Sequence, residues 1–210
     1  MKNTENLEDV KWGFLRETSD KAVEAGLDRD TGIKRTGLNE YLLVIFPKVN
    51  DWVYDHTIPN LPDGLRSRKR PDYRSESLRL IIEFDGLPHY QKPNIIRNDE
   101  DGTCFYKSLG YRVVRIPFFI QLTNKAVERM FGISVTEPLF NEAIPSLGPK
   151  GQNTPAFLCG AGVARMAEEF RKYPEQYLVN LNFLKSFDDD FLTGVSLLEK
   201  LYTGNCEQEV

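Results

Sequence analysis

The chain has 210 residues, of which 40% are hydrophobic and 28% charged, and its formal net charge is −4. This composition is typical of a globular protein with one domain, or one domain and an appendage, and the negative charge argues against a general nucleic-acid binder. No apolar run approaches the about 18 residues of a membrane-spanning helix, so we expect no membrane partner.

Cysteine use and the N-terminal segment bear on location. The three widely spaced cysteines form neither a disulfide framework nor a zinc pattern. The segment MKNTENLEDVKW is polar and lacks the apolar stretch of a signal peptide. We therefore expect a cytoplasmic protein in an intracellular, reducing setting.

Two helices are expected first in chain order. Apolar residues at helical spacing predict one over residues 5–25, which Gly26 ends. Thr36 is expected to cap the next, which ends at Pro47 and contains Glu40. Glu40 by itself indicates only a surface charge or a complement to the helix dipole.

A strand over 52–58, which includes His56, and a turn over 60–64 lead into a basic stretch around Asp72. We expect His56 to be structural or to flank the cleft. Residues 1–134 hold 21 basic and 20 acidic groups, so the negative balance lies in the rest of the chain. Basic groups beside carboxylates suit a phosphodiester substrate, while the alternative is a solvated loop. The basic residues of this stretch are Arg66, Arg68, Lys69, Arg70 and Arg74.

Three carboxylates are expected to converge next. The apolar run 78–84 predicts a buried strand, on which Glu83 and Asp85 lie two positions apart and therefore on one face. The polar stretch 73–76 can turn the chain and place Asp72 on the neighbouring strand.

Such convergence is unfavourable unless a cation is present, because like charges resist joint ionisation. A hard divalent metal takes oxygen ligands and removes the conflict. Taken singly, Asp72 and Asp85 indicate only turn residues. Glu83 decides between the two interpretations, because a glutamate is rarely buried unpaired among apolar residues.

The predicted core continues with a loop over 91–94 that contains Lys92. A helix follows over 95–109 and ends at Gly110, and a fourth strand covers 112–118. The resulting pattern predicts a mixed α/β sandwich.

The C-terminal part is predicted to be helical and without recognisable chemistry. Prolines mark 137–151 as a linker or extended arm, and helices are expected over 154–172, 174–187 and 191–202. We expect this acidic part to leave the carboxylates open to solvent.

The expected organisation is a nuclease-like α/β domain over 1–135, a linker over 136–150 and a helical region over 151–210. The last of these regions offers a surface for a homodimer or a protein partner.

A resemblance rests on the carboxylate stretch. Pro71-Asp72 followed by Glu83-Phe84-Asp85 resembles the PD-(D/E)-x-K nuclease superfamily. The string EFDGLPHY, from Glu83 onward, resembles the E-x-D-G-x-x-H-Y signature of a Vsr-like branch, related to very-short-patch mismatch repair endonucleases.

The resemblance covers roughly residues 36–122, passing through Asp99 and the segment LGYRVVRI. The lysine of the superfamily would fall at position 85, where this chain has Asp85. In the Vsr-like branch a histidine soon after Asp-Gly contributes to the site, and His89 fits that place.

The resemblance implies a restriction-endonuclease-like core of order α-β-β-β-α-β, a mixed sheet flanked by helices, with the helical C-terminal region as an appendage. It implies a Mg²⁺-dependent endodeoxyribonuclease, with Mn²⁺ as a substitute, that acts on DNA in restriction, repair or recombination. The implied ligands of one or two metal ions are Asp72 and Glu83, with the backbone carbonyl of Phe84. Asp85 either binds the second ion or orients the nucleophilic water.

The resemblance further implies that His89 acts as general acid or base and that Glu40 faces the metal. Lys92 is expected to join the basic residues around Asp72 in binding nucleic acid. Two alternatives remain open: a catalytically weak nucleic-acid-binding module, which the absent lysine favours, and an RNA-directed nuclease. A purely structural protein would leave Glu83 unexplained.

Overall fold

The computed structural model describes residues 37–59, 61–62, 67–149 and 152–204. The helix predicted over 5–25, the Thr36 cap and Arg66 lie outside these residues. The described strands are β1 (Trp52–Tyr54), β2 (Tyr73–Ser75), β3 (Leu80–Asp85) and β4 (Arg112–Pro117). The described helices are α3 (Leu38–Ile45), α4 (Pro88–Gln91), α5 (Pro93–Ser108), α6 (Asn124–Phe131), the 3₁₀ turn η4 (Pro155–Phe157), α7 (Gly160–Lys172), α8 (Pro174–Lys185), α9 (Asp190–Thr193) and α10 (Val195–Thr203).

The protein is an α/β protein built on a mixed four-stranded sheet of order β1-β2-β3-β4. β1, β2 and β3 pair antiparallel, and β3 and β4 pair parallel through the α5 crossover. The predicted order of elements is confirmed for the described core, with the short helix α4 as an addition. Among the described residues, no helix has the length and apolar character needed to cross a membrane.

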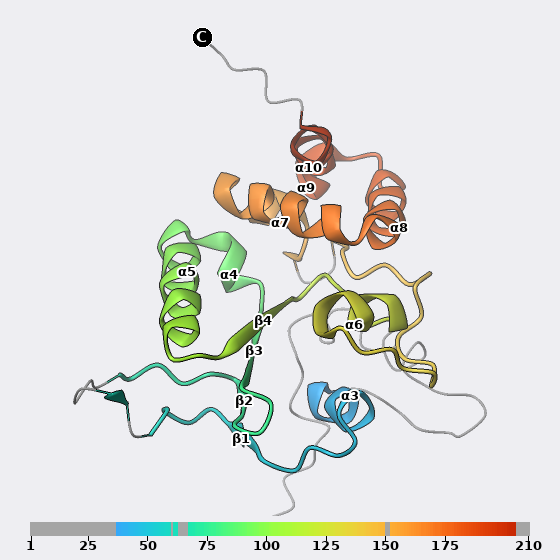
Figure 1. The fold of residues 1–210 in the computed structure, drawn as a ribbon. Helices are drawn as coiled ribbons and strands as arrows, with labels where there is room; N and C mark the ends of the chain where they lie inside the picture. The colour runs from blue at the N-terminus through green and yellow to red at the C-terminus, as the bar shows by residue number, and fades with distance from the viewer. Residues whose placement is uncertain (1–36, 60, 63–66, 150–151, 205–210) are drawn as a thin grey trace, which may run out of the picture.

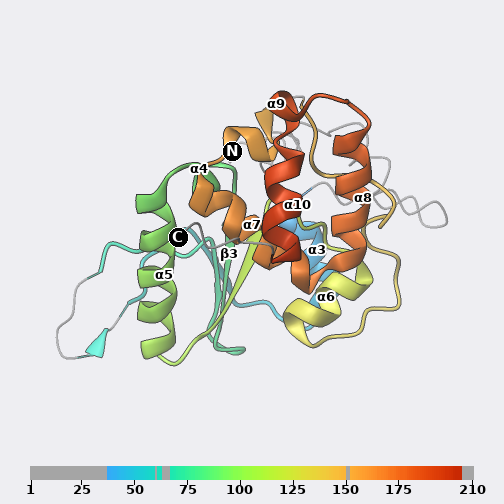
Figure 2. The same ribbon diagram turned by 90° about the horizontal axis from the view of Figure 1, so that it is seen from above.

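Helices cover both faces of the sheet (Figures 1 and 2). α5 lies against one face, α3 and α6 lie on the other, and α7, α8, α9 and α10 gather beyond the end at which β3 and β4 finish. Successive side chains of β3 alternate between the two faces. Ile81 joins the small cluster under α5, whereas Leu80 and Ile82 join the main core.

The strand boundaries differ from the prediction around Asp72. Tyr73–Ser75 forms β2 itself, and the turn lies in the exposed residues 76–79. β2 pairs on both edges and its three residues are buried, so tertiary pairing outweighs the polar character of Arg74 and Ser75. β1 stops at Tyr54, because Asp55 has a φ of 44° and leaves the extended conformation.

Two helices were not predicted. α4 lies just before the loop expected over 91–94 and overlaps it only at Gln91, with Pro88 at its first turn. α6 has signals that the sequence carries: Thr123 caps it through a hydrogen bond from the Ala126 amide, and Gly132 ends it at φ 72°. α5 begins at Pro93 and runs through Gly102 without a break.

The stretch over 137–149 contains no helix or strand, and it is packed into the molecule. Leu139, Phe140 and Leu147 belong to the main hydrophobic cluster. The Asn180 side chain of α8 accepts hydrogen bonds from the amides of Ser146 and Leu147, at 2.9 and 2.8 Å. The same cluster continues to Leu198 in α10, so one core joins the sheet and the C-terminal helices.

The expected final helices are present with breaks. Pro155 opens a 3₁₀ turn before α7. Gly194, at φ 64°, separates α9 from α10.

Candidate functional site

Asp72 and Glu83 are neighbours on adjacent strands. The ladder pairs Tyr73 with Ile82, and one further step of the same register brings Asp72 opposite Glu83. An Asp72 Oδ accepts a hydrogen bond from the Phe84 amide at 2.7 Å, and the Asp72 amide donates to Glu83 Oε at 3.4 Å. Directly opposed residues share a face of the sheet, so these two carboxylates lie together on the α5 side.

The surroundings of the Asp72–Glu83 pair disfavour the charged form of both carboxyl groups. Burial, reinforced by the charge of Asp72, raises the pKa of Glu83 to about 7. Burial also raises the pKa of Asp72, with a contribution from the charge of Asp85. The charge of Arg115 opposes both shifts without cancelling them. Burial and the adjacent Glu83 raise the pKa of the Tyr106 hydroxyl on α5.

Asp85, at the end of β3, is fully buried and paired with two arginines. Arg115 of β4 donates to both carboxylate oxygens, from Nε at 2.8 Å and from a terminal nitrogen. Arg165 of α7 donates at 2.5 Å to Oδ2 of Asp85, the same oxygen that accepts from Arg115 Nε. Asp85 therefore has two guanidinium partners, whereas the ion pairs among the described residues include neither Asp72 nor Glu83.

His89 is held by Asp99 of α5. The Nδ1 atom lies 2.9 and 3.0 Å from the two Asp99 oxygens, and 3.5 Å from the nearer oxygen of Asp85. Burial acts to lower the pKa of His89, but the Asp99 hydrogen bond and the charges of Asp85 and Asp99 outweigh it, so the pKa is raised. The side chain keeps 31% of its surface exposed.

Asp99 in turn accepts from Arg165 at 2.8 Å and lies 3.1 Å from Arg115. Although burial acts to raise the pKa of Asp99, these contacts and the His89 hydrogen bond lower it. Two aspartates, two arginines and one histidine thus form a closed network beside the Asp72–Glu83 pair. We call Asp85, His89, Asp99, Arg115 and Arg165 the ionic network.

The prediction that the C-terminal helices leave the carboxylates open is wrong for Asp85, which is fully buried, whereas Asp72 and Glu83 are partly exposed. α7 packs directly on α4, where the Cys159 amide donates to the Tyr90 carbonyl at 3.2 Å. Gly162 permits this approach, because a Cβ there would lie 1.8 Å from the Tyr90 oxygen. The docked helix brings Arg165 onto Asp85.

Two groups of side chains could hold a metal ion. The first is Asp72 with Glu83. The second is Asp85, His89 and Asp99, whose candidate ligand atoms all lie within 4.8 Å of one another. The second group already contains two guanidinium groups, whereas the first has no ammonium or guanidinium partner among the described residues.

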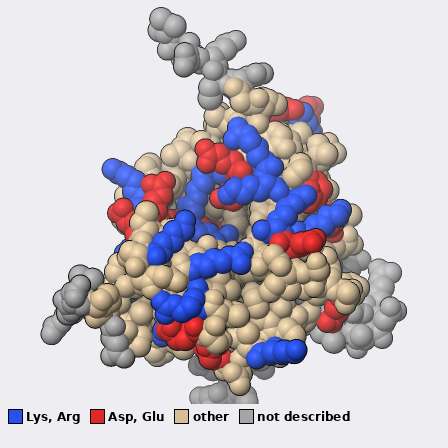
Figure 3. Space-filling view, in the orientation of Figure 1, with Lys and Arg blue, Asp and Glu red and all other residues tan. Residues whose placement is uncertain are grey.

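The basic residues predicted to bind nucleic acid are dispersed. Arg74 is 4% exposed and pairs with Glu76, which does not favour its predicted contact with a phosphate. Arg70 pairs with Asp55 on the surface, at 3.3 Å. Figure 3 shows Lys and Arg side chains across the middle of one face, with Asp and Glu side chains between them.

For four further residues the predicted roles in catalysis or nucleic-acid binding stay predictions. Arg68 and Lys92 are exposed, and the Nζ of Lys69 lies against α5, near Gly102. Glu40 accepts from the Gly37 amide at 2.6 Å and so closes the first turn of its own helix. The catalytic role of Glu40 stays a prediction.

His56 is exposed, with Nδ1 2.6 Å from the Tyr54 carbonyl oxygen. This local contact agrees with a structural role at the end of β1.

Sequence reasoning missed four site residues. Asp99 lies within the stretch that carries the resemblance, but no spacing rule joins it to His89. Arg115 could have been found from the parallel pairing, because its register partner is Glu83. Tyr106 and Arg165 come from helices whose contacts no local pattern reveals.

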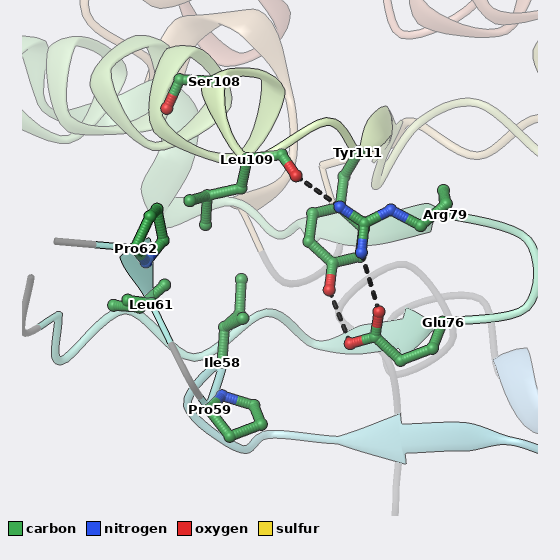
Figure 4. A pocket seen from close by; sticks show the side chains of 9 residues that line it. All are labelled: Ile58, Pro59, Leu61, Pro62, Glu76, Arg79, Ser108, Leu109 and Tyr111. Atoms are coloured by element: carbon green, nitrogen blue, oxygen red, sulfur yellow. Dashed lines mark hydrogen bonds and ion pairs between the residues drawn. The ribbon is translucent and has the colours of Figure 1, made fainter. Parts of the chain in front are cut away.

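A separate pocket lies at the opposite ends of β3 and β4, near the 76–79 turn and the end of α5 (Figure 4). Its volume is about 560 Å³. The polar side chains of the pocket interact with one another. The Arg79 guanidinium carbon lies 4.0 Å from the centre of the Tyr111 ring, and both Arg79 and the Tyr111 hydroxyl donate hydrogen bonds to Glu76. The pocket is thus remote from the carboxylates, and its polar groups are already paired.

Comparisons of this chain with protein-family models, with curated proteins and with solved structures found no match.

Proposed function

We propose that this protein is a metal-dependent endonuclease that hydrolyses DNA phosphodiester bonds, with Asp72 and Glu83 as the central metal ligands. The observation that carries the proposal is this partly buried cross-strand pair, in which the pKa of Glu83 is raised to about 7. The resemblance to the PD-(D/E)-x-K superfamily and its Vsr-like branch supports the same assignment.

The donor set fits a hard cation. Two carboxylates, with the Phe84 carbonyl as the proposed third ligand, offer the oxygen ligands that Mg²⁺ and Mn²⁺ take. A bound Mg²⁺ ion would supply an activated water and stabilise negative charge on the phosphate. A cation would also relieve the repulsion that raises the pKa of Glu83.

His89 is the proposed proton-transfer group. Its Nδ1 faces Asp99, which fixes the ring and directs Nε2 away from that carboxylate. A histidine oriented by a carboxylate on one nitrogen is suited to move a proton on the other. The partial exposure of the side chain leaves room for this transfer.

Asp85 has a different environment from the other two carboxylates. Its oxygens are occupied by Arg115 and Arg165. Direct coordination of a metal by Asp85 would require it to release one guanidinium group. In this proposal it anchors the ionic network, and its role as a ligand stays a prediction.

The deciding experiment is plasmid DNA cleavage with Mg²⁺ by wild type and by Asp72→Ala. We expect wild type to cleave and the variant to be inactive, because losing a ligand removes water activation and charge stabilisation together. Asp101→Ala, an exposed aspartate on α5, is the matched control and should cleave normally. His89→Ala is expected to lose about 10²–10⁴-fold in kcat, the usual range for one general acid or base.

One alternative function has an observation in its favour. Asp85 stands where the superfamily has lysine, and it is neutralised inside the protein. A nuclease fold that binds nucleic acid without turnover would be consistent with this. Binding of labelled DNA by wild type, together with no cleavage of any DNA or RNA, would favour this binding module. Cleavage of RNA alone would favour the RNA-directed nuclease.

A further inference from the structure

Arg165 makes a set of contacts that is unusual for a helix-packing residue. Its guanidinium donates to Asp85 at 2.5 Å, to Asp99 at 2.8 Å and to the His89 carbonyl at 3.3 Å. The same group lies 4.9 Å from the centre of the Tyr90 ring. Its side chain is only 16% exposed. One α7 residue thus contacts β3, α4 and α5 together.

The placement is specific, because burying a guanidinium is unfavourable unless carboxylates and hydrogen bonds compensate it. The approach also depends on Gly162, one turn earlier in α7, since any side chain there would collide with the Tyr90 carbonyl. Packing of α7 alone would not need a buried guanidinium at position 165.

Arg165 also bears on which carboxylate His89 uses. Asp85 and Asp99 both lie near Nδ1, at 3.5 and 2.9 Å. Arg165 bridges the two carboxylates, because it donates to the Asp85 oxygen that Arg115 Nε also contacts and to the Asp99 oxygen that lies 2.9 Å from Nδ1. Without Arg165, the Asp99 oxygen that faces Nδ1 would lose its guanidinium partner and Asp85 would keep Arg115 alone, so the two carboxylates would no longer be bridged beside the ring.

We propose that Arg165 is a positioning residue for His89: it holds Asp85 and Asp99 so that the imidazole ring keeps one orientation toward the reacting phosphate. The proposal rests on the proposed function for its catalytic consequence. It makes the C-terminal helices part of the nuclease site.

A structural latch between α7 and the sheet is the competing explanation, and the two differ at His89. The chain has two histidines, so ¹⁵N-histidine labelling gives few signals to assign. We expect Arg165→Met, which keeps most of the packing volume, to lose or shift the signal of the hydrogen-bonded Nδ1 proton of His89. The His56 signal should not move.

A matched control exists on another helix pair. Arg129 of α6 donates to the Lys172 carbonyl and to Glu175, and lies 5.8 Å from the centre of the Tyr173 ring. Arg129→Met should leave the His89 signal unchanged. An unchanged His89 signal in folded Arg165→Met would overturn the proposal.

Measurements of DNA cleavage give an independent test of the proposal. Arg165→Met should lower kcat by about 10–10²-fold with little change in KM, since a small misplacement of a catalytic group has costs of this order. In the His89→Ala background the same substitution should cost almost nothing further, because the two residues act as a unit. Additive losses in the double variant would contradict positioning through His89.

The proposal stays testable if Arg165→Met does not fold, and also if wild type shows no cleavage. If Arg165→Met does not fold, Arg165→Lys keeps the charge and loses the two-pronged contact, and should show the same shift at His89. If wild type cleaves no substrate, the proposed function fails, while the His89 signal still decides whether Arg165 orients the ring.

Discussion

Glu83 is a carboxylate within an apolar strand, and its pKa is raised from 4.5 to about 7 by burial and by Asp72. The unfolded chain releases this proton near pH 4.5, whereas the native protein keeps it to about pH 7. Stability from this group is therefore present at acid pH and is lost as the pH rises through this window. The site is formed at the expense of stability at neutral pH.

We expect Glu83→Gln to remove this loss. At about pH 8 its free energy of unfolding should exceed that of wild type by on the order of 2 kcal/mol, and at about pH 5 the two should be closer. Urea denaturation at both pH values measures the difference. Glu100→Gln, on the exposed face of α5, is the control. Equal pH dependence of wild type and Glu83→Gln would mean that Glu83 has an ordinary pKa.

The residues of the site were predictable to different degrees. Period-two alternation alone is enough to put Glu83 and Asp85 on one face, because neighbouring side chains of a strand alternate. That alternation says nothing about what covers the face. Asp85 therefore looked like a metal ligand, when its actual surroundings are Arg115 and Arg165. The second arginine is 80 positions away in the chain.

At the scale of elements, α7 decides how closed the site is. Gly162 lets the helix approach the Tyr90 carbonyl, and a Cβ at this position would lie 1.8 Å from its oxygen. We expect Gly162→Ala to destabilise the protein by about 1–3 kcal/mol, the usual range for overpacking, despite the better helix propensity of alanine. Chemical denaturation gives the value.

Gly160→Ala is the matched control, two residues earlier in the same helix, where an added Cβ meets nothing within 4 Å. It should be neutral or slightly stabilising. If both variants unfold alike, α7 does not need its close approach to α4.

Elements were predicted well where local chemistry is strong. α5 was found from its apolar spacing and its end at Gly110, which has a φ of 82°. β2 was mistaken for a turn, because its three residues are stabilised by pairing on both edges and not by their own propensity. The cap signals of α6 were present in the sequence but were not used.

At the scale of the whole molecule, the sheet and the C-terminal helices share a core. Phe119, just after β4, lies 4.7 Å from the ring of Phe170 in α7, measured between ring centres. Truncation after Gly148 would remove Phe170 and the other buried C-terminal side chains of the cluster. We expect the truncated chain to lose its cooperative unfolding transition and its near-ultraviolet circular dichroism.

The full-length chain is the reference for this truncation and should show the transition. A cooperative transition in the truncated chain would instead support an independent domain over 1–135, as predicted from the sequence.

The last prediction concerns the response of the whole protein to a cation. A ligand that binds only the native state must stabilise it, by about 2.7 kcal/mol at a concentration 100 times its Kd. We expect Mg²⁺ to raise the Tm of wild type, and more at about pH 8 than at about pH 6, because the cation competes with the proton held by Glu83. Asp72→Ala should lose the shift, and Asp101→Ala should keep it. Absence of a shift with Mg²⁺ or Mn²⁺, together with no cleavage of DNA or RNA, would leave the nucleic-acid-binding module as the better account of this fold.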